Sequence, residues 1–177
     1  DHAELGPKLE NRIAQALDQR PFIVLHPGAG ARHKRWSSKN FTEVLRQLEA
    51  RHGFGVIIIG GPDDRSTGQE IVDSLKQAGA NALCLTGSME LRKTAAVVNR
   101  ARLFLGADSG LAHLAVALGT PSVVLFGPSD QQKWGTRDRH HAIVSKNLPC
   151  APCFIFGYHK PCRHIACMSK IDVSDVT

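Results

Sequence analysis

Five short apolar runs, each containing or closed by glycine or proline, constrain the fold of this 177-residue chain more than any other feature. Their apolar character is continuous rather than alternating, so both faces of each strand must be covered. A parallel sheet between two layers of helices meets that requirement. The predicted strands lie in PFIVLHPG (21–28), FGVIIIGGP (54–62), ANALCLTG (80–87), ARLFLGAD (101–108) and PSVVLFGP (121–128).

Amphipathic segments separate these runs. Residues 37–53, 64–79, 89–101 and 110–119 have apolar positions at helical spacing. Alternating strands and helices predict an α/β fold with a Rossmann-like, doubly wound parallel sheet. HAIVSK (141–146) predicts a last strand at the edge of the sheet.

The chain has the composition of one medium-sized globular domain, with 42% hydrophobic and 21% charged residues. We expect residues 1–20 to form a linker or helix that leads into the sheet. Residues 21–146 are expected to form the domain itself. Residues 147–177 lose periodicity, become rich in Cys and Pro, and are expected to pack on the domain.

Charge and cysteine usage indicate the cellular compartment and the class of binding partner. The first residues are charged and amphipathic, unlike a signal peptide, and no apolar run is long enough to span a membrane. Five cysteines, four of them near the end, do not resemble the disulfide framework of a secreted domain, which favours a reducing compartment. The net charge of +6 favours an anionic partner. Few aromatic residues and scattered basic residues argue against nucleic acid.

Ligands of doubly wound sheets bind at the carboxyl ends of the strands, so the loops there are the candidates for chemistry. The loop HPGAGARHKRW follows the first strand. Its small residues Gly28, Ala29 and Gly30 would let backbone amides approach a phosphate, and Lys34 lies among the cations that follow. A glycine-rich turn with solvated basic residues is the alternative, because neither a Walker loop nor the dinucleotide fingerprint is present.

The loop GADSGLAH follows the fourth strand. Asp108 or Ser109 is a natural cap for the next helix, and Gly110 lies in its first turn, where free amides attract an anion. Asp108 would repel that anion, so we expect it to accept hydrogen bonds from sugar hydroxyls or loop amides. His113 is expected to support the loop. An ordinary capped helix without a ligand remains the alternative.

Two further loops could hold a nucleoside. In GGPDD, Asp63 or Asp64 could bind ribose hydroxyls, and in TGSMEL, Met89 and Leu91 could contact the face of a base. A turn followed by a helix start is the simpler interpretation of each.

The late cysteines follow the pattern C-x2-C-x8-C-x4-C. Four thiolates suit a structural zinc ion, although the spacing of the second pair is wide for a zinc knuckle. Free or oxidisable thiols are the alternative. The candidate ligands are Cys150, Cys153, Cys162 and Cys167.

Taken together, the loops resemble a known family. HPGAG-ARHKRW, IIIGGPDD, ADSGLAHLA with TPSVVLFGPSD, and the late CAPCF…C…CM are similar to glycosyltransferase family 9, the ADP-heptose lipopolysaccharide heptosyltransferases. The resemblance covers nearly the whole chain from Phe22. Its cysteine pattern is most similar to the heptosyltransferase II branch.

The resemblance implies a GT-B fold, in which two Rossmann-like domains face a cleft, with this chain as the carboxyl-terminal half that binds the donor, ADP-heptose. Lys34 would contact the donor diphosphate, and Met89 the adenine. Asp63 or its neighbour would be the acid that binds the nucleoside. The phosphates and the heptose would be received by Asp108, Ser109, Gly110 and Leu111.

Such enzymes are about twice as long, and their general base lies in the first domain. The chain is therefore expected to bind the donor but to be inactive alone, without a catalytic residue of its own. The acceptor, the lipopolysaccharide inner core, would be held by the missing domain. The resemblance implies a cytoplasmic protein, at most peripherally attached to the inner face of the bacterial inner membrane, that needs no metal for its chemistry.

Two other functions stay open. One is a different GT-B enzyme with another nucleotide-sugar donor. The other is a non-catalytic module, stapled by zinc, that binds a partner through its basic surface.

Overall fold

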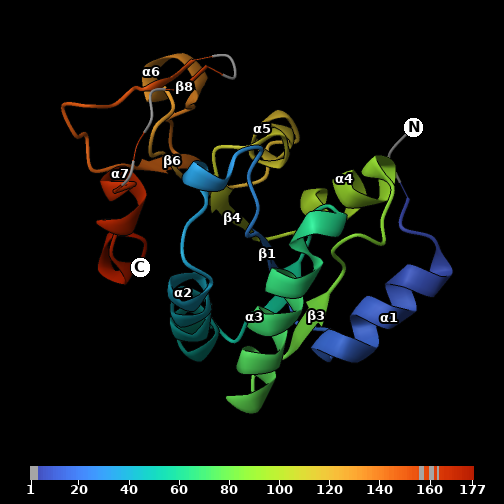
Figure 1. Ribbon diagram of the computed structural model, residues 1–177. Coiled ribbons are helices and arrows are strands. Elements are labelled where there is room, and N and C mark those ends of the chain that lie inside the picture. The colour runs from blue at the N-terminus through green and yellow to red at the C-terminus, as the bar shows by residue number, and fades with distance from the viewer. Residues whose placement is uncertain (1–3, 156–157, 160–161, 163) are drawn as a thin grey trace.

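The computed structural model describes residues 4–155, 158–159, 162 and 164–177, and a six-stranded sheet forms its centre (Figure 1). The strand order is β3-β2-β1-β4-β5-β6, and every neighbouring pair is parallel. The order reverses between β1 and β4, which is where doubly wound sheets bind ligands. The predicted Rossmann-like α/β fold is confirmed. The strands are β1 (Phe22–His26), β2 (Gly55–Ile58), β3 (Ala82–Cys84), β4 (Leu103–Ala107), β5 (Ser122–Leu125) and β6 (His141–Val144).

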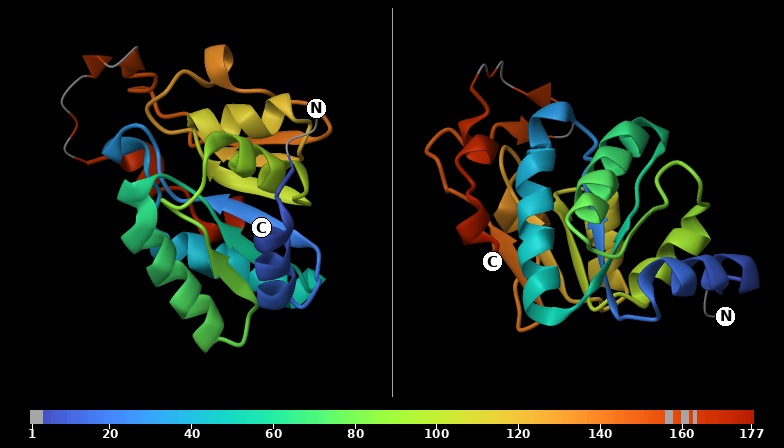
Figure 2. Two further views of the ribbon diagram at one scale, coloured as in Figure 1. Left: turned by 90° about the vertical axis from the view of Figure 1, so that its right-hand side faces the viewer. Right: turned by 90° about the horizontal axis from the view of Figure 1, so that it is seen from below.

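Helices cover both faces of the sheet (Figure 2), as the continuous apolar strands require. On one face, α2 (Ser38–His52) and α3 (Arg65–Gln77) pack against alternate strand residues such as Leu25 and Ile58. On the other, α1 (Pro7–Leu17), α4 (Leu91–Asn99) and α5 (Gly110–Ala117) pack against their neighbours, such as Val24 and Ile57. Adjacent strand residues thus enter opposite cores, both of which exclude water.

The first helix is part of the folded body rather than a free linker. Ile13 and Leu17 of α1 are buried, and Leu5 ahead of the helix is only 3% exposed. In Figure 1 the helix lies at the β3 end of the sheet.

The C-terminal segment lies at the opposite, β6, end (Figure 1). It contains the short pair β7 (Phe154–Ile155) and β8 (Tyr158–His159), and α7 (Ala166–Ser169), and the short helix α6 (Gln131–Trp134) precedes β6. Cys167 and Met168 of α7 and the following Ile171 enter the same core as α2. The buried indole of Trp36 donates a hydrogen bond of 3.0 Å to the carbonyl of Ile171, which ties the chain end to the loop after β1.

Among the described residues, none of the helices has both the length and the apolar character needed to cross a bilayer.

Candidate functional site

A cleft at the carboxyl ends of β1 and β4 consists of two connected lobes. The first, which we call the apolar lobe, has a volume of about 740 Å³. The second, the charged lobe, has a volume of about 300 Å³. The two lobes share Gly30, Ser109, Gly110 and His113. Otherwise the apolar lobe is lined by His26, Gly60, Gly61, Met89, Leu91, Thr94, Leu111, Leu114 and Ala117, and the charged lobe by Lys34, Asp108, Trp134 and Phe154.

The start of α5 lies where the lobes meet. Ser109 has extended backbone with φ −160°, and its hydroxyl accepts a hydrogen bond of 3.4 Å from the amide of Ala112, so Ser109, one of the two candidates, is the cap. The amides of Gly110 and Leu111 come before the first intrahelical donor and face the cleft end of the helix. Unpaired amides and the positive end of the helix dipole are features that favour an anion.

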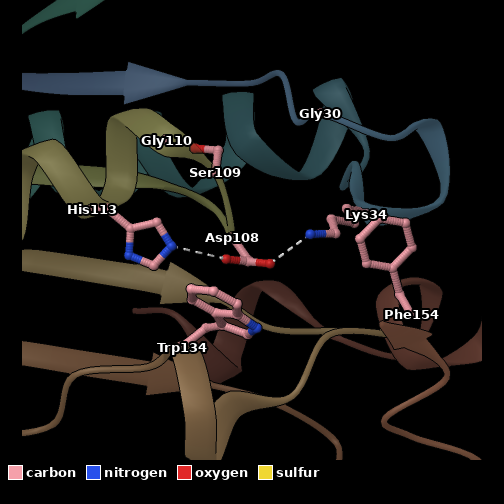
Figure 3. Close-up of a pocket in the computed structure, with 8 residues that line it drawn as sticks. All are labelled: Gly30, Lys34, Asp108, Ser109, Gly110, His113, Trp134 and Phe154. Atoms are coloured by element: carbon pink, nitrogen blue, oxygen red, sulfur yellow. Dashed lines mark hydrogen bonds and ion pairs between the residues drawn. The ribbon is translucent and has the colours of Figure 1, made fainter. Parts of the chain in front are cut away.

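Asp108 lies between two basic side chains in the charged lobe (Figure 3). Its Oδ2 accepts a hydrogen bond of 2.7 Å from the Lys34 ammonium, and its Oδ1 lies 3.5 Å from His113 Nε2. Figure 3 shows the two side chains approaching the carboxylate from opposite sides. Lys34 ends the short 3₁₀ helix Arg32–Lys34, which brings its ammonium from the loop after β1. One hydrogen bond to Asp108 leaves the ammonium two more donors for a ligand.

Aromatic side chains from distant segments close the charged lobe. Lys34 Nζ lies 4.3 Å from the centre of the Phe154 ring, a cation–π distance. Phe154 is placed by backbone bonds, because the amides of Cys153 and Phe154 both donate to the carbonyl of Pro128. Trp134 of α6 lines the same lobe, with its ring centre 6.1 Å from that of His113. The charged lobe is therefore completed by residues that follow β5 and β6.

A buried chain of hydrogen bonds supports the junction from below. His26 Nε2 lies 3.4 Å from Asp64 Oδ2, and His26 Nδ1 lies 3.1 Å from the Ser109 hydroxyl. A carboxylate can only accept, so His26 Nε2 is the donor to Asp64, and Nδ1 faces the Ser109 hydroxyl. The hydrogen bond from His26 lowers the pKa of Asp64 below its ordinary value, against the effect of burial. Asp64 thus fixes His26, which in turn orients the cap of α5.

Most of the predicted donor-binding residues come together in this cleft. Gly30, Lys34, Met89, Leu91 and His113 line it, as do Asp108, Ser109, Gly110 and Leu111. The loops that the sequence analysis selected by the strand-end rule therefore meet at one place.

Three predicted residues lie elsewhere. Gly28 and Ala29 are buried beneath the cleft and do not line either lobe. A Cβ at Gly28 would overlap the carboxylate of Asp64, so this glycine is needed for packing against Asp64. Asp63 is exposed on the 3₁₀ helix Pro62–Asp64 and does not line either lobe, whereas Asp64 turns inward and accepts a 3.0 Å hydrogen bond from the amide of Gly61.

Sequence reasoning missed Trp134, Phe154 and the role of His26. Trp134 follows a strand-end loop, FGPSD, and the N-terminal cap at Asp130 was a usable signal for a helix there. Phe154 carried no such signal, because its segment has no periodicity.

Cys150, Cys162 and Cys167 carry free thiols in the structure. Burial raises the pKa of Cys167, and the three other late cysteines raise it further. Within the described ranges, no group of three or more His, Cys, Asp or Glu side chains is arranged to hold a metal ion. The structural zinc at Cys150, Cys153, Cys162 and Cys167 stays a prediction.

Comparisons with known proteins identify the family. The model of glycosyltransferase family 9 (heptosyltransferase) matches residues 2–164. Lipopolysaccharide heptosyltransferase 3 of Escherichia coli is 34% identical over 134 residues, a match that covers 72% of this chain and 38% of that protein. Lipopolysaccharide heptosyltransferase 2 of Salmonella typhimurium is 34% identical over 145 residues and is matched over 80% of this chain and 39% of its own length.

Among solved structures, the E. coli ADP-heptose lps heptosyltransferase II superposes with a TM-score of 0.73 at 24% identity. That match covers 94% of this chain and 49% of the solved chain, so the present chain spans less than half the length of the proteins it matches. A family model that matches residues 2–164 nonetheless covers almost all of this chain. The chain belongs to glycosyltransferase family 9, the heptosyltransferase family.

Proposed function

We propose that this chain is the donor-binding half of a heptosyltransferase that transfers heptose from ADP-heptose to the lipopolysaccharide inner core. One observation carries the proposal: the Lys34 ammonium lines the charged lobe together with Ser109 and Gly110, where α5 begins. A cation with spare donors beside unpaired helix amides is an arrangement that suits a diphosphate.

The apolar lobe suits the nucleoside. The side chains of Met89, Leu91 and Leu114 offer apolar surface for the adenine. The backbone of Gly60 and Gly61 borders the same lobe, where the ribose would lie. Because the lobe adjoins the start of α5, a base held there would place its phosphates at the junction.

The same contacts would assist the reaction. When the sugar leaves the nucleotide, negative charge grows on the departing diphosphate, and Lys34 with the α5 amides would stabilise it without a metal ion. The acceptor hydroxyl must also be positioned and deprotonated. We assign those tasks to a second, amino-terminal domain of the whole enzyme, so the chain alone is expected to bind ADP-heptose without transferring it. The whole enzyme would act in the cytoplasm, at most peripherally attached to the inner membrane, where its acceptor is.

Isothermal titration calorimetry tests the proposal. The chain is titrated with ADP, with AMP, which lacks the second phosphate, and with UDP, which carries a different base. We expect ADP to bind most tightly, AMP to lose the contacts of the second phosphate, and UDP to lose those of adenine. A folded chain that binds none of the three would overturn the proposal, and a preference for UDP would favour a different nucleotide-sugar donor.

A further inference from the structure

Trp134 stands out among the residues of the cleft, because it is a large aromatic side chain left 42% exposed. The other exposed large hydrophobic residue among those that the structure describes is Leu91, at 68%. Both border the cleft, Leu91 at the apolar lobe and Trp134 at the charged lobe. An exposed apolar side chain at the border of a cavity offers surface that a bound ligand can cover.

The direction of the ligand decides which part of it meets Trp134. This step rests on the proposed function, in which the base occupies the apolar lobe and the diphosphate lies at the start of α5. The group attached to the far phosphate then extends into the charged lobe. That group is a sugar, and the lobe, at about 300 Å³, is at the lower end of the range for small-molecule sites.

We propose that Trp134 is a sugar-binding residue: its indole packs against the C–H face of the sugar carried by the donor and determines how tightly a sugar nucleotide binds relative to the free nucleotide. A pyranose ring is polar at its edges and apolar on its faces. Indole offers a wide, rigid apolar surface that loses little conformational freedom on binding.

The polar groups around the indole match the polar edge of a sugar. Asp108 Oδ1 and His113 Nε2 lie 3.5 Å apart on the same lobe, so an acceptor and a donor for adjacent hydroxyls are side by side. Figure 3 shows the Trp134 ring directed toward Asp108 and His113 rather than away from the lobe. A flat apolar wall next to paired polar groups is complementary to a sugar, and neither part alone would be.

Local structure fixes the short helix that carries Trp134. The carboxylate of Asp130 accepts hydrogen bonds from the amides of Gln132 (2.9 Å) and Lys133 (3.2 Å), which caps α6. At the other end, a Cβ on Gly135 would overlap the side chain of Ile143, so this glycine lets α6 lie close to β6. The indole therefore extends from a capped and packed helix, so the backbone that carries it needs little ordering when a ligand binds.

Affinities for ADP and ADP-heptose, measured by calorimetry on the same chain, test this inference. In the unsubstituted chain we expect ADP-heptose to bind about tenfold more tightly than ADP, a gain of the size that aromatic packing supplies. Trp134→Ala should bring this ratio close to one and leave ADP affinity unchanged. Trp134→Phe should keep part of the gain. Leu91→Ala is the matched control, because it should weaken both ligands by the same factor.

The possible failures are distinguishable. If the chain binds ADP but the ratio survives Trp134→Ala, or if ADP-heptose never binds more tightly than ADP, the role of Trp134 is wrong and the proposed function stands. Equal weakening of both ligands by Trp134→Ala would also contradict it, since a wall for the sugar does not touch ADP. If ADP itself does not bind, the proposed function fails and this inference with it. Circular dichroism of each variant verifies that the fold is intact.

Discussion

The two lobes of the cleft differ in how their residues reach the site. The apolar lobe is built from strand ends and first helical turns, with Met89, Leu91 and Leu111 presented by the sheet and its helices. The charged lobe adds Trp134 and Phe154, which come from short elements after β5 and β6. One lobe therefore follows from the fold, and the other depends on segments that pack onto it.

Because of this difference, we expect one set of residues to determine affinity for the nucleotide and another to recognise the sugar that the nucleotide carries. The strand-end rule brings together a site for a base and its phosphates in any doubly wound sheet of this kind. Residues added by irregular segments can change without disturbing the sheet. We therefore expect substitutions in the apolar lobe and at the junction to change binding of every adenine nucleotide, and substitutions in the outer part of the charged lobe to act on the sugar.

Lys34→Met should have the largest effect on nucleotide binding. It removes a charge-assisted hydrogen bond to the diphosphate, so ADP affinity should fall about 10- to 100-fold. Titration calorimetry measures it. The matched control is Lys39→Met on α2, an exposed lysine in a helix outside the cleft, which should bind ADP normally. If the Lys34→Met chain binds ADP as well as the Lys39→Met chain does, Lys34 does not bind the diphosphate.

Asp64→Asn should weaken the support that both lobes share. The carboxylate accepts from His26, so its loss should lower the free energy of unfolding by about 1–3 kcal/mol at neutral pH. Urea unfolding measures this change.

The same group gives a pH dependence with a defined sign. Because the pKa of Asp64 is lowered in the folded chain, ionised Asp64 stabilises the fold above its unfolded pKa of about 4. That contribution is lost as the pH falls through the lowered folded-state pKa. The difference in stability between the chain and its Asp64→Asn variant should therefore shrink at acidic pH, and a constant difference from pH 7 to pH 2 would show that the ionisation of Asp64 is irrelevant.

Met89→Ala should have a smaller effect, limited to ligands that carry a base. Truncating the side chain removes part of the apolar surface proposed to contact adenine, so ADP affinity should fall about fivefold. Inorganic pyrophosphate, which has no base, should bind both chains equally. Competition between the two ligands measures both values, and equal weakening of pyrophosphate would assign Met89 to the fold instead of the base.

Modification of Cys162 should have the smallest effect on ADP binding, because Cys162 lines neither lobe. Its reactivity can be predicted as well. Amide hydrogen bonds from the segment after it lower the pKa of this exposed thiol, whereas burial raises that of Cys167. With a chelator present, iodoacetamide should modify Cys162 well before Cys167, because the thiolate is the reactive form. Mass spectrometry of timed samples reports the order. Metal analysis of the untreated chain tests the zinc prediction separately, and zinc near one equivalent per chain would support it.

The sheet and half of the site could be predicted from sequence for one physical reason. A strand buried on both faces must be apolar throughout, so the strands can be recognised in the sequence. The loops at their carboxyl ends are then located as well. Lys34, Met89 and the residues from Asp108 to Gly110 were selected in this way, whereas Leu111 was selected by resemblance to the family. A cap at Asp108 or Ser109 was also predicted, since either side chain before a glycine and an apolar helix suits that position, and Ser109 is the one that caps the helix.

The remainder depended on contacts that local sequence does not encode. Asp63 and Asp64 are neighbours of one type, and the contacts that hold Asp64 inward, with His26 and beside Gly28, come from a distant segment. Phe154 reaches Lys34 through backbone bonds to Pro128, far from any periodic segment. Trp134 belongs to a four-residue helix, too short for a hydrophobic period to be recognised.

The central claim is that one ADP molecule spans from the apolar lobe to the start of α5. A titration of the isotope-labelled chain with ADP, followed by ¹H–¹⁵N correlation spectra, tests it most directly. We expect the amide signals of Gly30, Met89, Gly110 and Leu111 to shift together along one saturation curve, with the indole signal of buried Trp36 unchanged. Shifts confined to residues 147–177, or separate saturation curves for Met89 and Gly110, would contradict a single ligand across the two lobes.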